Sequence, residues 1–148
     1  MTDNRVLSEQ QALIYVMLTM AAANGELTEA AFARIGRLVD VLPIFEARTP
    51  QTVPSVAEGF AELMSSEDGL DTLLDMVAQA LPPSLHETAY ALAVEIAAAD
   101  LQIQPEEIRL LELLCTHLTI DKLAAAAIER GARARLARLP SHTEKADK

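Results

Sequence analysis

Hydrophobic residues recur along this chain at helical spacing, and no run of useful length alternates between apolar and polar positions as a half-buried strand does. The pattern predicts helices at about residues 8–23, 28–42, 55–65, 70–81, 84–99, 105–118 and 121–139, with a proline-bracketed connector over 44–54. Because the connections are short, neighbouring helices are expected to run antiparallel. The predicted fold is therefore all-α, a single globular bundle of about seven helices.

Residues suited to helix capping stand at several predicted starts. Ser8 is followed three positions later by a glutamine, and Ser84 is followed at the same distance by a glutamate, which is the spacing of a capping box. Thr28 and Asp121 are good N-caps for the helices that follow them. Pro105 suits a first helical position, where its missing N–H costs nothing. These residues fix the starts of five helices.

The helical spacing also predicts which side chains of the last two helices are buried. The buried stripe over 105–118 consists of Ile108, Leu111, Leu114 and Leu118. The stripe over 121–139 consists of Ile128, Ala132, Leu136 and Leu139.

The chain repeats one of its own patterns. Ala21-Ala22-Ala23-Asn24-Gly25-Glu26-Leu27 and Ala97-Ala98-Ala99-Asp100-Leu101-Gln102-Ile103 each close an apolar stretch, and they lie 76 positions apart. Apolar positions on both sides keep this register; Ile14 corresponds to Tyr90, and Ile35 to Leu111. The economical interpretation is an internal duplication of a helical hairpin.

Length and composition predict one domain. The 148 residues are enough for a single core, expected over residues 1–140, followed by a disordered polar tail over 141–148. The longest apolar run, about residues 12–23, is too short to span a bilayer. It also lacks the basic start of a signal peptide, and one cysteine excludes an intrachain disulfide. We therefore expect a cytoplasmic protein that is not transmembrane.

The distribution of charge along the chain indicates which kinds of partner are expected. The net charge is −10, although residues 122–148 carry seven basic and three acidic side chains. An acidic body repels phosphate backbones, so nucleic acid is not an expected partner. Cations or a basic protein surface fit better, with membrane association only peripheral and through partners. The arginines near the C-terminus are expected to offset the acidic body.

Four further polar residues have simple predicted placements. Glu95 interrupts an apolar helix and is expected on the solvent side, the alternative being a buried carboxylate paired with an arginine. His86 is expected at the surface. Cys115 and His117 are two positions apart on one helix and face in different directions, which is poor geometry for a shared metal. Serine nucleophile elbows, phosphate-binding glycine loops and paired-cysteine zinc spacings are all missing from the sequence, so no enzyme is predicted and no catalytic residue is assigned.

The two repeated turns resemble the Ala-Asp-Gly-Glu-Ile-Ser-x-x-Glu element of the TerB-like family of tellurite-resistance proteins. The resemblance spans about residues 8–138 and includes the long apolar helix before each turn. It implies an all-helical bundle, a link to tellurite resistance or to a broader metal or chemical stress response, and a divalent-cation site at the acidic turns.

Transferred by position, the implied metal ligands are Asp100, Glu106 and Glu107 in the second turn and Asn24 and Glu26 in the first. Hard oxygen ligands suit calcium, magnesium or manganese better than zinc. The first turn departs from the family pattern, since it has an asparagine in place of the aspartate. An alternative role for the acidic residues is helix capping, because carboxylates near a helix N-terminus are favourable without any metal.

Two function hypotheses therefore stay open, with a third behind them. The first is a non-enzymatic TerB-like protein that binds a divalent cation and passes that state to a protein partner. The second is a metal-independent protein–protein interaction module. A helical enzyme is the third and rests only on the clustered carboxylates.

Overall fold

The computed structural model describes residues 7–25, 27–46, 53–99 and 103–140, and within these ranges it contains seven α-helices and no strand. The all-α prediction is confirmed. The predicted polar tail over 141–148 lies outside the described residues. The elements in chain order are α1 (Glu9–Ala21), η1 (Ala22–Asn24), α2 (Glu29–Val41), η2 (Pro43–Phe45), α3 (Val53–Met64), α4 (Gly69–Ala80), η3 (Pro83–Leu85), α5 (His86–Ala98), α6 (Pro105–His117) and α7 (Lys122–Arg135).

Most helix starts follow the predicted capping chemistry. Ser8 forms the capping box of α1, in which its hydroxyl accepts from the N–H of Gln11 at 3.1 Å. Thr28 accepts from the N–H of Ala31 at 3.1 Å, and Asp121 caps α7. The prediction for Ser84 is wrong, because the chain after Pro82 first forms the 3₁₀ turn η3 and α5 begins only at His86.

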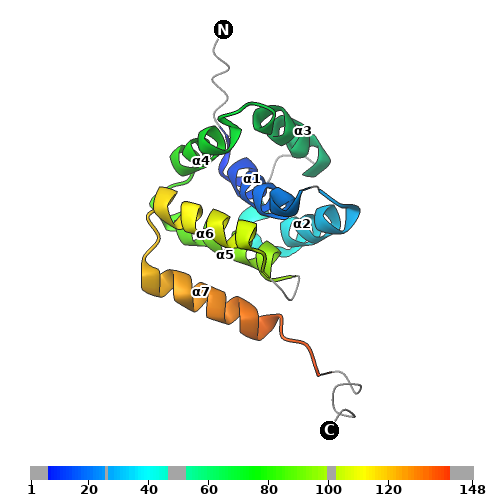
Figure 1. Ribbon diagram of the computed structural model, residues 1–148, viewed down its shortest axis with the longest axis vertical. Helices are drawn as coiled ribbons and strands as arrows, with labels where there is room; N and C mark the ends of the chain where they lie inside the picture. Colours follow the sequence, from blue (N-terminus) through cyan, green and yellow to red (C-terminus); the bar gives the residue numbers. More distant parts are fainter. Residues whose placement is uncertain (1–6, 26, 47–52, 100–102, 141–148) are drawn as a thin grey trace.

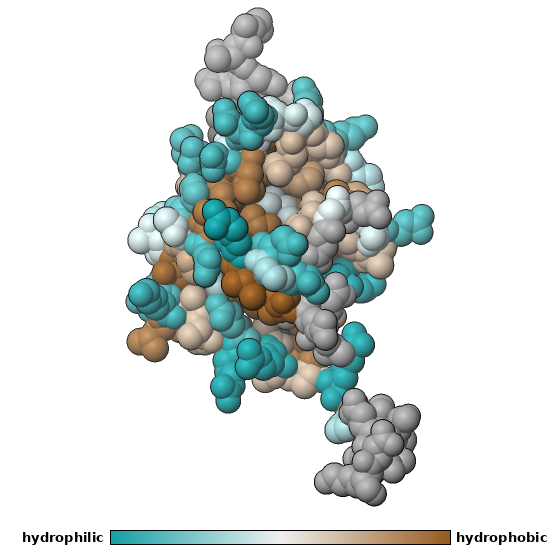
Figure 2. Space-filling model, in the orientation of Figure 1, coloured by the Kyte–Doolittle hydropathy of each residue, from teal (hydrophilic) through white to brown (hydrophobic). Residues whose placement is uncertain are grey.

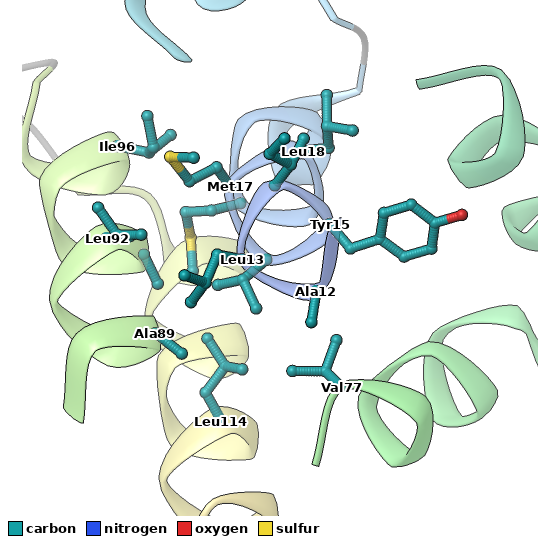
Figure 3. Packing of buried hydrophobic residues seen from close by; sticks show 14 of the residues in the cluster. Ala12, Leu13, Tyr15, Met17, Leu18, Val77, Ala89, Leu92, Ile96 and Leu114 are labelled. Atoms are coloured by element: carbon teal, nitrogen blue, oxygen red, sulfur yellow. The ribbon is translucent and has the colours of Figure 1, made fainter. Parts of the chain in front are cut away.

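Helix α1 is at the centre of the bundle and packs against α2, α3, α4 and α5, whereas α7 lies at the edge and packs on α5 (Figure 1). Every side chain from Ala12 to Met20 is buried, as expected for a helix that is hydrophobic on all sides. Figure 3 shows Leu13 and Met17 pointing toward the side occupied by Leu92 and Ile96 of α5. On the opposite side Tyr15 meets Phe60 of α3 edge-to-face, with ring centres 6.2 Å apart. The described helices include none long and apolar enough to cross a membrane.

The helix bounds agree with the internal duplication. Shifted by 76 positions, α2 (Glu29–Val41) coincides with α6 (Pro105–His117), and α1 falls within one residue of α5. Corresponding residues share burial, since Ile14 and Tyr90 are buried, as are Ile35 and Leu111. The first helix of each copy is central and packs on its counterpart, whereas α2 and α6 lie outside them.

Three expectations about buried faces and connectors are wrong. Ile108 is 48% exposed, because it lies beside a groove that no other part of the described chain fills. Leu139 is 94% exposed, because α7 ends at Arg135 and the following residues leave the bundle. The connector ends earlier than predicted, since α3 begins at Val53 and includes Pro54 in its first turn, where proline is tolerated.

Candidate functional site

Glu106 and Glu107, two of the predicted cation ligands, lie in the first turn of α6. Glu107 is 3% exposed, and its Oε1 accepts a hydrogen bond from the N–H of Gln104 at 2.7 Å. This contact is the N3 half of a capping box and satisfies a backbone donor at the helix start. Glu106 is exposed. The structure therefore gives Glu107 a capping role and leaves Glu106 facing solvent.

The remaining predicted ligands are described in part or not at all. Asp100 and Glu26 lie outside the described residues, and Asn24 ends η1 without a described side chain. Element η1 packs against α6, so the first repeated turn reaches the helix that follows the second. Among the His, Cys, Asp and Glu residues that the structure describes, no three lie close enough together to hold a metal ion. The cation site stays a prediction.

The expected solvent position of Glu95 is wrong. Its side chain is 18% exposed and forms an ion pair with Arg135, which ties α5 to α7. This is the alternative of a buried carboxylate with an arginine partner, and burial without such a partner would be costly. His86 is also not a surface residue, since its ring lies between the carbonyl oxygens of Leu118 at 2.9 Å and Leu81 at 3.0 Å.

Cys115 and His117 point in different directions, as predicted. Cys115 faces a groove beside α7, whereas His117 Nε2 lies 3.7 Å from the carboxylate of Asp75 on α4. The two side chains therefore do not form a shared metal or catalytic site.

An apolar groove of about 830 Å³ lies between α5, α6 and α7. Its floor is α5, through Tyr90, Val94 and Ala98, and its two walls are α6 and α7, which both pack on α5. This volume falls in the range typical of ligand-binding clefts. Figure 2 shows hydrophobic side chains exposed near the centre of the face on which Figure 1 draws α6 above α7, with hydrophilic side chains around them.

The walls of this apolar groove combine exposed hydrophobic side chains with charges. Ile103 and Ile108 are 40% and 48% exposed and lie along the α6 side. Exposed large apolar side chains that gather beside an apolar groove are a common feature of binding surfaces. Glu112 of α6 and Lys122, Glu129 and Arg133 of α7 complete the lining.

Tyr90 carries a polar contact in the floor of the apolar groove. Its hydroxyl donates a hydrogen bond to Glu129 Oε2 at 2.5 Å, which connects α5 to α7. Burial, and then the hydrogen bond to Glu129, raise the pKa of the Tyr90 hydroxyl well above its usual range. Burial likewise raises the pKa of the Cys115 thiol. A thiol that keeps its proton is a poor nucleophile.

Sequence reasoning missed this groove, although part of its signal was present. The sequence places the apolar residue Ile108 in the helix over 105–118 and Ile103 just before it, and the structure leaves both exposed. The sequence alone could not show that these two side chains stay exposed, because their exposure depends on where α7 crosses α5.

Comparison of this chain with protein-family models, with curated proteins and with solved structures gives no match.

Proposed function

We propose that this chain is a non-enzymatic, metal-independent interaction module that binds an amphipathic helix of a partner protein in the apolar groove. The observation that carries the proposal is the groove itself, in which two helical walls stand on a third helix and leave Ile103 and Ile108 exposed. Helix-in-groove recognition uses apolar anchors at i, i+3, i+4 and i+7, which suit a long apolar cleft.

The dimensions of the groove fit such an occupant. The α6 wall is formed by a helix of 13 residues, and 13 residues of α-helix extend about 20 Å at 1.5 Å per residue. A partner helix of similar length can therefore lie along it. Its apolar side would cover Ala98, Ile103 and Ile108, and its polar side would face water.

The test is photo-crosslinking in the native host. Benzoylphenylalanine replaces Ile108 in one variant and Ala61, an exposed residue of α3, in a control variant. A protein captured at position 108 and not at 61 is then purified, and its Kd is measured in chelator. We expect Ile108→Glu to weaken binding about tenfold or more, since a buried isoleucine contact is lost and a charge is introduced. The control Ala61→Glu leaves the Kd unchanged.

Two results would reject the interaction module. One is equal binding by Ile108→Glu and wild type, because the partner would then lie elsewhere. The other is loss of the wild-type complex in chelator, because binding would then depend on a metal.

We also propose a second function, in which a TerB-like cation site serves tellurite resistance or a broader metal or chemical stress response. The observation that favours it is the packing of η1 against α6, which brings the region of the first repeated turn against the helix that carries the exposed Glu106. Asp100, Glu106, Glu107, Asn24 and Glu26 would supply hard oxygen ligands of the kind that calcium, magnesium or manganese prefer.

Calorimetric titration separates this second function from the first. Calcium, magnesium and manganese are each titrated against wild type, Asp100→Ala and Glu106→Gln, with Glu112→Gln on the same helix as the matched control. A cation site predicts binding heat that Asp100→Ala and Glu106→Gln lose and that Glu112→Gln keeps. Identical curves for all four proteins would remove the metal role.

A further inference from the structure

A second hollow lies next to the apolar groove and has a different chemistry. It encloses about 350 Å³ and is lined by Arg34, Arg37 and Leu38 of α2, Glu95 and Ala99 at the end of α5, and Leu136 and Arg138 after α7. We call it the arginine pocket. Three arginines from two distant parts of the chain converge there, on a protein whose net charge is −10.

The acidic side chain in the arginine pocket is paired with neither Arg37 nor Arg138. Glu95 forms its ion pair with Arg135, which is a fourth arginine. Within the described ranges, neither Arg37 nor Arg138 forms an ion pair. Because the Glu95–Arg135 pair is itself neutral, the pocket presents net positive charge.

The arginine pocket continues the apolar groove. Leu136 lines both hollows, and the successive residues Ala98 and Ala99 of α5 line one each. The combined surface is therefore mainly apolar along α5 and α6, carries charges of both signs along α7, and is cationic where α5 ends. An occupant that fills both must be apolar along its length and negatively charged at one end.

We propose that the partner helix carries aspartate or glutamate side chains at the end that lies over the C-terminus of α5, and that their carboxylates bind in the arginine pocket. This inference rests on the proposed interaction module. Guanidinium groups bind carboxylates through paired, charge-assisted hydrogen bonds, which fix orientation as well as adding affinity. The arginine pocket would thus set the direction in which the helix lies.

The charges on the groove walls favour a peptide over an acyl chain. Glu112 and Glu129 line the apolar groove. A hydrocarbon tail would remove water from these carboxylates without replacing its hydrogen bonds, which is unfavourable. A helix can place a lysine or serine side chain opposite each of them.

Peptide display on the whole protein tests the proposal. A library of random 15-residue peptides is selected, in chelator, against immobilised wild type, the double variant Arg37→Glu with Arg138→Glu, and Arg130→Glu. Arg130 is an exposed residue of α7 that lines neither hollow and serves as the matched charge control. The three substituted side chains are exposed, and circular dichroism confirms that each variant is folded.

On wild type and on Arg130→Glu we expect enrichment of helical apolar spacing together with acidic residues at one end. On the double variant the apolar spacing persists, and the acidic end is lost or replaced by lysine and arginine. For one selected peptide, the double variant and the acid-to-amide peptide each weaken binding about tenfold, and added salt weakens wild type more than the double variant.

The outcomes separate the two proposals. Apolar spacing without an acidic end on wild type would overturn the arginine-pocket inference and leave the interaction module standing. No enriched apolar spacing would overturn both. Dodecanoate bound in the apolar groove in the absence of any enriched peptide would assign that groove to an acyl chain and would also overturn both.

Discussion

Removing the Tyr90 hydroxyl tests whether the contact between α5 and α7 stabilises the fold. Tyr90 is 2% exposed and donates to Glu129 Oε2 at 2.5 Å, whereas Glu129 itself is exposed. In Tyr90→Phe the aromatic packing stays and the donor is lost. The carboxylate of Glu129 then returns to water, so the free-energy cost falls at the low end of the range for charge-assisted bonds, about 1.5 kcal/mol. For a domain of this size that cost corresponds to a decrease in Tm of about 3–6 °C.

The same variant makes a prediction about alkaline pH. In the unfolded chain a tyrosine ionises near its ordinary pKa of 10.0, whereas burial and then Glu129 raise the pKa of folded Tyr90 above that value. The stabilisation from this group is therefore complete below the unfolded pKa and is lost as pH rises toward the folded pKa. At about pH 11 the unfolded state gains about 1.4 kcal/mol from tyrosine ionisation that the folded state cannot match.

Urea unfolding at about pH 8 and about pH 11 measures this effect. Wild type is expected to exceed Tyr90→Phe by about 1.5 kcal/mol at the lower pH and by almost nothing at the higher pH. At the lower pH the free energy of unfolding of Glu129→Gln should lie between those of wild type and Tyr90→Phe, because glutamine keeps a hydrogen-bond acceptor and removes the charge. A stability difference that stays constant across this range would show that Tyr90 ionises as easily folded as unfolded, which would refute the reasoning.

Three further predictions concern stability alone. Arg135→Ala leaves the Glu95 carboxylate, which is 18% exposed, without its partner and should lower the free energy of unfolding by about 1–2 kcal/mol. The control Arg130→Ala, on the same helix, should change it by less than about 0.5 kcal/mol. Equal urea midpoints for the two variants would contradict a structural role for the ion pair. Gly131→Ala should raise the Tm, since an added Cβ has nothing within 4 Å and alanine is favoured over glycine in a helix interior by about 1 kcal/mol. Gly25→Ala should lower the Tm, because φ at Gly25 is 121°, a conformation that alanine rarely adopts. Shifts of the two Tm values in the same direction would refute this contrast. Glu107→Ala should lower the free energy of unfolding by about 1 kcal/mol, with or without chelator. Glu107→Gln should be about as stable as wild type, because glutamine also completes a capping box. A loss of stability in thermal melts that depends on chelator would instead indicate a bound cation.

Local chemistry was enough to predict where most helices begin. Ser8, Thr28 and Asp121 each accept a backbone hydrogen bond from within the next three residues, so the information lies in a few neighbouring positions. Ser84 failed because the backbone after Pro82 first takes a 3₁₀ turn, a choice that capping preferences do not determine.

The candidate site was less predictable. The resemblance of the repeated turns to a known family predicted a cation site at the acidic residues. In the structure Glu107 caps α6 and Glu106 is exposed. The apolar groove depends on how α7 lies on α5, and the arginine pocket depends on which residues of α2 face the same hollow as the end of α5 and the residues after α7. Their residues are far apart in the chain, as Arg37 and Arg138 are, and no short pattern connects them.

The sequence by itself determined the all-α class, the number and order of the helices, and a 76-residue repeat whose copies have matching bounds, because helical periodicity and capping are properties of adjacent residues. Only the tertiary structure decided that Glu95 is paired with Arg135, that Ile108 stays exposed, and that an apolar groove opens into an arginine pocket. Those features follow from the packing of helices against one another. A helix of given sequence can be buried or uncovered on the same face, depending on the distance and angle of its neighbours.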